Sequence, residues 1–406
     1  MFFAYKKTKH ILILNQESET RPNQSEIAFR MAIEDLSNEK EDYVITTVNY
    51  IHTNPRFIGS GKHTHLAADG CEVNLSRVPL FVHDTKFMEL IKKRMNDERM
   101  NNLENRMKIE KRGDSIYIVY PPIYQKVSDF DGMILMSWGK DDEKAFEIQD
   151  KLEKCGVVPL NSLKTSREPP SETPKRGLAE SNSKIIAHKL FKEHGVPIPE
   201  TLYFSNHEYD EKFIKKALRN FGAPPWFVKA EYGVGGISVW RVGTEKEIEH
   251  SIDKVLAITN SLKKAGERFI IQKAIRSRAG NRPQRTRIIV QDGKVTGGLL
   301  WTGAEGSITD NAYGDKDNAN IALKSIPTDC LKELTEVQKD AAIKATKAVG
   351  LWYSGVDLVG TPENPLVLEA NHAPGLWFHK MVGQNTIEDL AVGMIAKIDR
   401  KQHKHL

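Results

Sequence analysis

The sequence predicts a multidomain α/β protein. Its 406 residues exceed one ordinary domain, because about 150 residues form a domain and this length therefore gives two or three. The first third alternates strand-like and helical patterns and includes the continuous apolar run ILIL at 11–14, typical of a buried parallel strand. A proline-rich break at 165–176 separates this third from two further parts in which strands and helices also mix.

Composition excludes several classes of protein. Apolar residues make up 39% of the chain and charged residues 28%, which is ordinary for a globular protein and unlike a disordered or fibrous one. No apolar run approaches the roughly 18 residues of a membrane-spanning helix, so we expect no membrane association. Three widely spaced cysteines cannot form a disulfide framework and indicate a reducing, cytoplasmic environment: Cys71, Cys155 and Cys330.

Residues 1–165 are predicted to form an N-terminal α/β domain. Apolar, β-rich runs predict its strands at 11–14, 43–50, 115–120 and 131–139. The stretch at 84–112 is rich in Lys, Glu, Met and Asn, with methionines and a leucine at helical spacing. We expect it to be a helical insertion without chemistry of its own.

Two further parts follow the break, at 166–270 and 271–406. The first begins with a helix that ends at Gly195, before two prolines that cannot continue it, and goes on to the strand WFVKA and a glycine-rich turn. The second contains a hairpin with Asp292 and Gly293 at its turn, a dipeptide that favours a two-residue connection. Its last two strands carry conspicuous acidic residues.

These acidic residues lie inside apolar strands. Asp357 interrupts GVDLV, while Glu369 and Asn371 lie two residues apart in LVLEAN and therefore share one face of a strand. Antiparallel pairing across the turn TPENP would place Asp357 opposite them. Buried carboxylates need a partner, and two carboxylates with an amide oxygen suit a hard cation such as Mg²⁺. Acids on an edge strand that faces solvent are the alternative.

The glycine-rich turn in KAEYGVGGISVW joins two strands, so it is neither a P-loop nor a dinucleotide fingerprint. Lys229 precedes the turn and would add a positive charge to an anion held by backbone N–H groups. The glycines that permit this approach are Gly233, Gly235 and Gly236. A plain glycine-rich hairpin is the alternative, but together with the acidic cluster the turn indicates a lid over a nucleotide.

A basic run without acids, QKAIRSRAGNRPQRTR, spans 272–287. Such runs usually form a solvated face, and nucleic acid is an alternative partner, although aromatic residues for stacking are absent from this stretch. Arg287 enters an apolar run, which indicates a cation directed into a site.

Taken in order over residues 131–398, the motifs resemble those of ATP-grasp enzymes, and most closely the RimK-like carboxylate–amine ligases, which include glutamate and peptide ligases. The resemblance is carried by GVVPLNS, NSKIIAHKLFKEHGVPIPET, WFVKAEYGVGGISVW, FIIQKAI, TRIIV, SITDNAYG, and the pair GVDLV and LVLEANHAPG. It implies an α+β ATP-grasp fold, in which an N-terminal α/β domain precedes two ATP-grasp subdomains.

The resemblance also implies roles for the matching residues around ATP. Lys184 and Lys229 would reach the phosphates under the glycine lid. The strand FIIQKAI would act as the hinge whose backbone holds the adenine edge, through Gln272, Lys273 and Ile275.

For the reaction itself, the resemblance implies that Arg287 faces phosphate and acyl groups and that Asn311 lies near the reacting centre. Mg²⁺, or Mn²⁺ in its place, would be held by Asp357, Glu369 and Asn371. The chain departs from the family pattern at Arg285, where an acid is usual, at Lys273, at the GVGG lid and at APGLWFHK. These departures leave the identity of the substrate open. In this fold the basic run would lie beside the acceptor cleft, so we expect an anionic substrate, such as an acidic amino acid or peptide end, rather than nucleic acid. Trp377, His372 and His379 are expected to wall the same cleft.

The implied chemistry is ADP-forming ligation of a carboxylate to an amine through an acyl phosphate. A small-molecule kinase on the same fold would use the same metal and phosphate residues, with a hydroxyl group as acceptor. A non-catalytic ATP-binding protein would not need both acids, so their retention argues against it. A small molecule or peptide is the expected substrate, and a homo-oligomer stays open.

Overall fold

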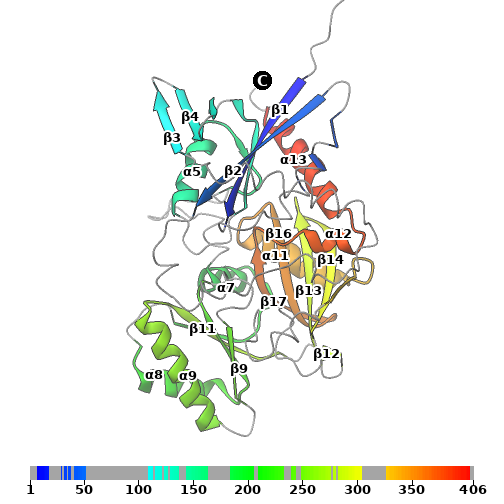
Figure 1. The fold of residues 1–406 in the computed structure, drawn as a ribbon. Coiled ribbons are helices and arrows are strands. Elements are labelled where there is room, and N and C mark those ends of the chain that lie inside the picture. The colour runs from blue at the N-terminus through cyan, green and yellow to red at the C-terminus, as the bar shows by residue number, and fades with distance from the viewer. Residues whose placement is uncertain are drawn as a thin grey trace, which may run out of the picture. The chain divides into compact units, whose positions relative to one another are not determined.

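The fold is described from a computed structural model (Figure 1). The residues it describes are 7–17, 29, 32–33, 35–37, 41–51, 108–112, 115–120, 123–126, 129–136, 143–162, 183–204, 209–232, 239–243, 248–275, 278–279, 282–303 and 326–402. The chain divides into two compact units. Unit 1 comprises Met1–Lys164 with Ala373–Leu406, and unit 2 comprises Thr165–His372. None of the helices in the described ranges is both long and apolar enough to span a membrane.

Unit 1 contains a parallel sheet in the order β2-β1-β6-β7. Its strands are β1 (Lys7–Glu17), β2 (Glu41–Ile51), β6 (Gly132–Met136) and β7 (Val158–Pro159), and its helices are α5 (Glu143–Lys154), α12 (Trp377–Met381) and α13 (Thr386–Gln402). Ile11, Leu12 and Ile13 are wholly buried in β1. The expectation of a buried parallel strand at ILIL is confirmed.

The C-terminal helix α13 packs on this sheet. A side chain at Gly132 would come within 2.6 Å of the end of the Ile398 side chain and 2.8 Å of the end of Met394, so glycine lets the helix pack here without these side chains moving. Lys397 Nζ donates to the carbonyl oxygens of Pro159 and Leu160, at 2.8 and 2.7 Å. These contacts explain why α13 belongs to unit 1.

A second sheet of unit 1 corrects part of the predicted helical insertion. It is antiparallel, in the order β3-β4-β5, with β3 (Lys108–Arg112), β4 (Ser115–Tyr120) and β5 (Ile123–Lys126). The helix predicted at 84–112 is wrong for residues 108–112, because pairing with the β-rich strand SIYIVY overrides the weak helical preference of Lys and Glu. Residues 84–107 lie outside the described residues.

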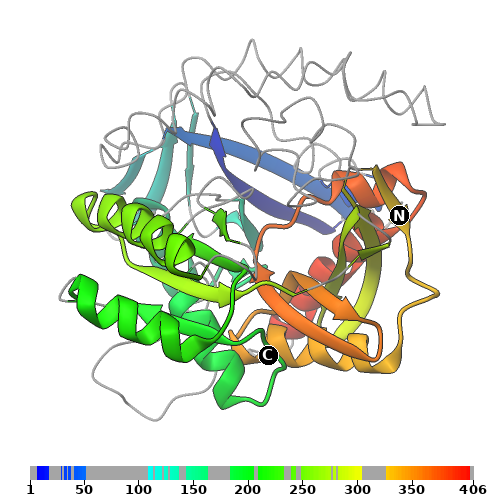
Figure 2. The ribbon, with the colours of Figure 1, turned by 90° about the horizontal axis from the view of Figure 1, so that it is seen from below.

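Unit 2 has an antiparallel sheet in the order β10-β9-β11-β8. These strands are β8 (Thr201–Phe204), β9 (Trp226–Ala230), β10 (Val239–Val242) and β11 (Phe269–Lys273). Helices α8 (Glu211–Phe221) and α9 (Ile248–Lys264) lie side by side over one face and bury Trp226 and Val228 with them (Figures 1 and 2). Because strand residues alternate, Phe227 and Lys229 occupy the opposite face.

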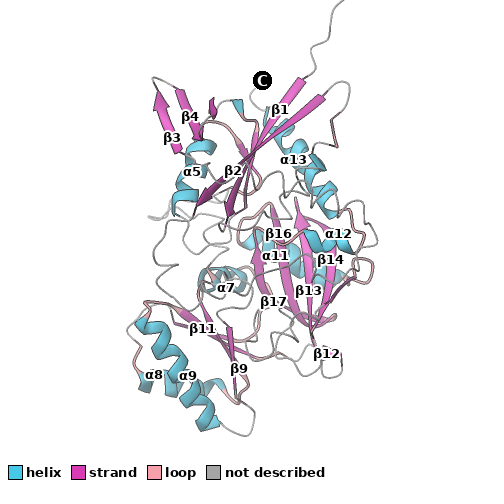
Figure 3. Ribbon diagram, viewed as in Figure 1, coloured by secondary structure: helices cyan, strands magenta, loops and turns pink. Residues whose placement is uncertain are grey.

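The other sheet of unit 2 is also antiparallel and runs β15-β14-β13-β16-β17, with β12 (Arg278–Ala279) paired to β13. Its strands are β13 (Arg282–Gln291), β14 (Lys294–Thr302), β15 (Ile326–Asp329), β16 (Tyr353–Thr361) and β17 (Asn364–Asn371). Asp292 and Gly293 have φ angles of 50° and 74°, so the predicted hairpin turn is confirmed. Helix α11 (Glu336–Ala348) covers one face, where Thr346 and Ser354 share a 2.6 Å hydrogen bond (Figure 3).

Candidate active site

The face of the β13-β16-β17 sheet opposite α11 carries the predicted acids. Asp357 pairs directly with Glu369 across β16 and β17, and with Arg287 across β16 and β13. The predicted antiparallel pairing of Asp357 with Glu369 is confirmed. Their common face follows from strand alternation, since neighbouring residues such as Val356, Leu358 and Ser354 turn toward α11.

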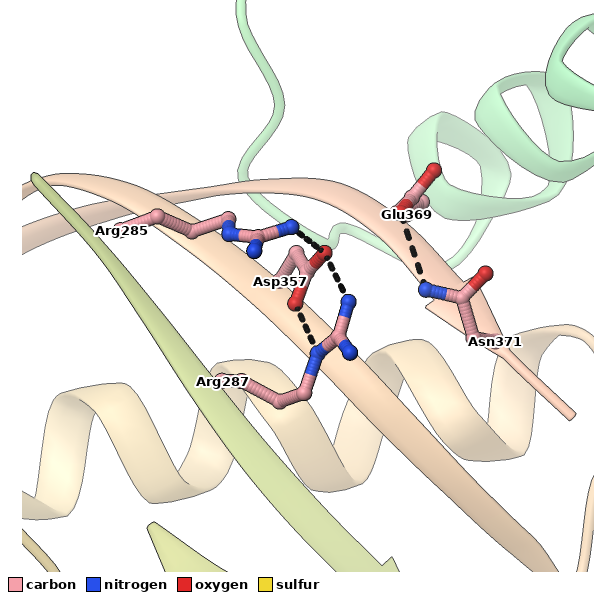
Figure 4. A network of polar contacts seen from close by, with 5 residues as sticks. All are labelled: Arg285, Arg287, Asp357, Glu369 and Asn371. Carbon is pink, nitrogen blue, oxygen red and sulfur yellow. Dashed lines mark hydrogen bonds and ion pairs between the residues drawn. The ribbon is translucent and has the colours of Figure 1, made fainter. Parts of the chain in front are cut away.

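Two arginines from β13 donate hydrogen bonds to the Asp357 carboxylate (Figure 4). Arg287 bonds it twice, from Nε to Oδ1 at 2.7 Å and from Nη2 to Oδ2 at 2.8 Å, and Arg285 Nη1 donates to Oδ2 at 2.5 Å. Burial alone would raise the pKa of Asp357, but the two guanidinium groups outweigh burial and hold that pKa well below its usual range. The carboxylate is therefore ionised inside the fold.

Arg285 is the residue that stands where the resemblance leads one to expect an acid. It lies opposite Trp301 across β13 and β14, and its guanidinium group lies 5.8 Å from the centre of that ring. The sequence offered one signal for its location, because residues 285 and 287 are two apart on a strand and must share a face. Arg285 thereby adds a second positive charge beside Asp357.

Glu369 and Asn371 lie next to each other on β17, with Asn371 Nδ2 donating to Glu369 Oε1 at 2.9 Å (Figure 4). The register between β16 and β17 shifts after Asp357, because Leu358 pairs with Val367 and leaves Leu368 as an extra residue. This bulge keeps Glu369 opposite Asp357. Asn371 shares the face of Glu369 because the two residues lie two apart on the strand.

This donor set fits a hard cation. Asp357 and Glu369 lie directly opposite each other on paired strands, so one cation could be held by both carboxylates. The bonds from Arg285 and Arg287 occupy much of the Asp357 carboxylate. Glu369 and the Asn371 amide therefore offer most of the oxygen ligands that Mg²⁺ accepts.

Two lysines face these acids, of which Lys229 is buried and Lys184 is half-buried. Lys229 Nζ donates to Gln272 Oε1 at 2.6 Å, and burial lowers its pKa to about 8, with the charge of Lys184 adding to the effect and that of Glu369 opposing it. Burial also lowers the pKa of Lys184, while Glu369 and Glu231 raise it. Two lysines that repel each other in a desolvated position favour a ligand with several negative charges.

The start of α7 (Lys184–Glu193) is fixed by a network that sequence reasoning missed. Ser183 caps the helix by accepting from Ile186 N, and its hydroxyl donates to Glu231 Oε1 at 2.5 Å. The other oxygen of Glu231 accepts from Arg268 Nε at 2.5 Å. The sequence contained one signal of this network, namely an acid, Glu231, two residues after Lys229 in KAEYG. The network ties the helix carrying Lys184 to the strand carrying Lys229.

The predicted hinge lies at the end of β11. Its backbone N–H groups at Lys273 and Ala274 bond to the carbonyl oxygens of Glu200 and Pro225, and the Lys273 side chain pairs with Glu200. The Gln272 side chain bonds to both Lys229 and Thr201. Its Nε2 donates to the Thr201 hydroxyl at 3.1 Å. Ile275 is half-buried. The predicted lid and reacting-centre residues lie outside the described residues: Gly233, Gly235, Gly236 and Asn311.

The expected wall of aromatic and histidine residues needs one correction. His379 is wholly buried in unit 1, where its Nδ1 lies 2.7 Å from Gln384 Oε1, so its predicted position on a cleft wall is wrong. His372 is buried in unit 2, and Trp377 begins α12. In the basic run, Arg282 is exposed on β13, and Arg276 lies outside the described residues.

Among the described residues of unit 2, four cations lie near these acids. Lys184, Lys229, Arg285 and Arg287 stand close to Asp357, Glu369 and Glu231. Desolvated cations this close to one another favour a bound anion. Such an arrangement can bind a polyphosphate and stabilise negative charge that moves during phosphoryl transfer.

Comparison with known proteins agrees with this chemistry. The profile of the RimK-like ATP-grasp domain matches residues 181–398, more than half of the chain. A probable alpha-L-glutamate ligase 1 of Shewanella amazonensis is 27% identical over 334 residues, which cover 81% of this chain and 95% of that protein. A probable alpha-L-glutamate ligase of Parasynechococcus marenigrum is 29% identical over 224 residues, 55% of this chain, but the match spans only 42% of that relative's length.

Among solved structures, a D-alanine–D-alanine ligase from Bacillus anthracis, complexed with ATP, superposes with a TM-score of 0.57 at 16% identity, covering 98% of this chain and all of that one. At this low identity the similarity is evidence for the fold alone, and it confirms the predicted α/β ATP-grasp architecture. The family match, the order of the motifs and the site geometry converge, and the chain belongs to the RimK-like ATP-grasp family.

Proposed function

We propose that this protein is an ATP-dependent carboxylate–amine ligase that forms an amide or peptide bond and releases ADP and phosphate. The observation that carries the proposal is that Lys184 and Lys229 lie close to the acids Asp357 and Glu369 in one unit, with Asn371 beside Glu369. The names of the relatives, alpha-L-glutamate ligases, support this reaction class. They also support an acidic amino acid or peptide end as the substrate.

In the proposed reaction a substrate carboxylate attacks the γ-phosphate of ATP, and an amine then displaces phosphate from the acyl phosphate. Lys184 and Lys229 would hold the phosphates, and the guanidinium group of Arg287 would offset charge on the transferring group. Mg²⁺, held by Asp357, Glu369 and Asn371, would neutralise the phosphate oxygens when bound. Asn311 and the glycines of the lid are proposed to complete the site. Most of the catalysis is then positioning and charge neutralisation.

The reaction class is tested by product analysis. The protein is incubated with MgATP and a panel of carboxylates with amines, and separately with polyols. A ligase should release free phosphate only when a carboxylate and an amine are both present, together with an amide product detected by mass spectrometry. A phosphorylated polyol with no free phosphate would instead identify a kinase and contradict the proposal.

Lys229 gives a pH-dependent prediction. Because burial lowers its pKa to about 8, the lysine loses its proton above that pH, and nucleotide affinity should fall as pH rises through 8. Bound phosphate would raise this pKa again, so binding near pH 8.5 should take up protons. Calorimetry in buffers of different ionisation enthalpy measures the uptake.

Lys229→Met should abolish that proton uptake and weaken ATP binding by roughly 10- to 100-fold, the loss of a charge-assisted contact of about 1.5–3 kcal/mol. Lys184→Met should weaken ATP binding similarly. Lys216→Met, on the exposed face of α8, is the matched control and should bind as the wild type does. Wild-type affinity and proton uptake in Lys229→Met would refute the phosphate role.

The basic run gives a prediction about the substrate. Replacing Arg276, Arg278 and Arg282 by Ala should raise the KM for an acidic substrate by about two- to fivefold per arginine, as expected for solvated charges, and leave the KM for ATP nearly unchanged. Steady-state kinetics measure both constants, with Arg219→Ala on α8 as the control. An unchanged substrate KM combined with lost retention on immobilised nucleic acid would favour the nucleic-acid alternative.

A further inference from the structure

His188 is a wholly buried histidine to which the proposed reaction assigns no role. It lies on α7 four residues after Lys184, and therefore one helical turn along the same face. Its ring packs at 5.9 Å from the Phe191 ring and edge-on at 6.5 Å from Tyr203. These two aromatic neighbours fix the plane of the imidazole.

The ring is aimed at the metal-site strand. His188 Nε2 lies 2.8 Å from the carbonyl oxygen of Leu368, although the two residues are 180 positions apart. A carbonyl oxygen only accepts, so Nε2 must carry the hydrogen and donate it. Burial lowers the pKa of His188 to about 4, and the charges of Lys229 and Lys184 favour the neutral ring further. A neutral imidazole with its proton on Nε2 suits this bond.

Leu368 is the extra residue of the bulge that sets Glu369 opposite Asp357. The adjacent residue Val367 is held as well, since its N–H donates to the carbonyl oxygen of Pro197 at 2.8 Å. Pro197 belongs to the segment that directly follows α7. Two hydrogen bonds from α7 and this segment therefore hold the bulge just before the first acid of β17.

From this geometry we infer that His188 is a positioning residue of the metal site: by donating to Leu368 O, it holds the β17 bulge in the form that presents Glu369 and Asn371 to the metal. The inference rests on the proposed function, in which those two residues bind Mg²⁺. It also links the helix of Lys184 to the ligands of the metal.

The test compares three variants of the full-length protein. Gln places its amide nitrogen close to the Nε2 position of His, whereas Asn reaches only the Nδ1 position and Met has no donor. Mn²⁺ binding in the presence of ADP is measured by electron paramagnetic resonance of the free ion. His188→Asn and His188→Met should bind Mn²⁺ roughly tenfold more weakly, as loss of an outer-shell contact does, and His188→Gln should stay within about twofold of the wild type.

Two controls separate this inference from its premise. His194→Met removes the same kind of bond on the same helix, because His194 Nδ1 lies 2.8 Å from Leu190 O, but it should leave Mn²⁺ affinity unchanged. Glu369→Gln should abolish Mn²⁺ binding. If it does not, the proposed metal site is wrong. If it does, and His188→Asn and His188→Met bind Mn²⁺ like the wild type, only the role of His188 fails.

The donor is tested by two further outcomes. Mn²⁺ affinity in His188→Gln as low as in His188→Met would overturn the inference, because the position would then need the ring rather than the donor. Should the Asn and Met variants not fold, spectra of the wild type with ¹⁵N-labelled histidine decide. They should show His188 with its proton on Nε2 and a resonance that moves on adding Mg²⁺ and ADP. A proton on Nδ1, or no movement, would refute the role.

Discussion

Glu369→Gln is expected to abolish measurable turnover while the protein stays folded. The substitution keeps the size of the side chain and removes the charge that attracts the metal, and Asn371 can still bond to the new amide. Metal-ion stabilisation of phosphoryl charge is worth several kcal/mol. Since 1.36 kcal/mol corresponds to a factor of ten in rate, the loss should be at least about 100-fold. Release of ADP, followed by a coupled assay over a range of Mg²⁺ concentrations, measures it.

The same hairpin supplies a matched control. Glu363 lies in the exposed turn between β16 and β17, so Glu363→Gln makes the same chemical change without touching the site. Its turnover and its melting temperature should equal those of the wild type. Unchanged activity in Glu369→Gln would contradict the proposal that this residue binds the metal. Loss of the folded state would show a structural role instead.

Asp357→Asn should strongly destabilise the protein. The carboxylate is buried between two guanidinium groups, and an amide removes the negative charge to which both of them are bonded. Breaking a buried ion pair from one side typically costs about 3–5 kcal/mol. For a unit of this size that loss lowers the melting temperature by roughly 6–20 °C. Differential scanning calorimetry measures it, and turnover should be lost as well.

The exposed pair of Asp340 and Lys344 on α11 provides the comparison. Asp340→Asn removes an acid of the same type from solvent, where such a pair contributes about 0–1 kcal/mol, so its melting temperature should stay close to that of the wild type. Equal melting temperatures for the Asp357 and Asp340 variants would contradict the view that the arginine pair depends on Asp357.

The pH dependence of this effect follows from the sign of the shift. The pKa of Asp357 is lower in the folded state than in the unfolded chain, so its stabilisation is present above the ordinary value near 4 and is lost as pH falls below it. The difference in melting temperature between wild type and Asp357→Asn should therefore be constant from pH 5 to 7. It should begin to shrink only below about pH 4.

The sequence predicted the acidic strands because their pattern is local. Period-two alternation places Glu369 and Asn371 on one face, and the short turn TPENP forces β16 and β17 to pair. The positions of Arg285 and His188 were not predictable in this way. Arg285 depends on which strand lies beside β16, and His188 depends on a contact with Leu368, far along the chain.

Residues 108–112 show where a local sequence pattern fails to predict the conformation. Their composition favours a helix weakly, and only the partner strand β4 decides their conformation. Likewise, nothing in the local pattern of α13 reveals that Lys397 donates to the carbonyl oxygens of Pro159 and Leu160. Local patterns predict elements and shared faces, whereas the partner of each face is set by tertiary packing.

The bond between His188 and Leu368 has a consequence for the order of folding during synthesis. A chain grows by about 5–20 residues per second, so Leu368 is made roughly 10–40 seconds after His188. Over that interval α7 can dock on β9 through Ser183 and Glu231, but its side toward β17 has no partner strand. The face of the proposed metal site is therefore among the last parts of unit 2 to form. A nascent chain that stalls before β17 would have an incomplete site, and His188 would lack its bond to Leu368.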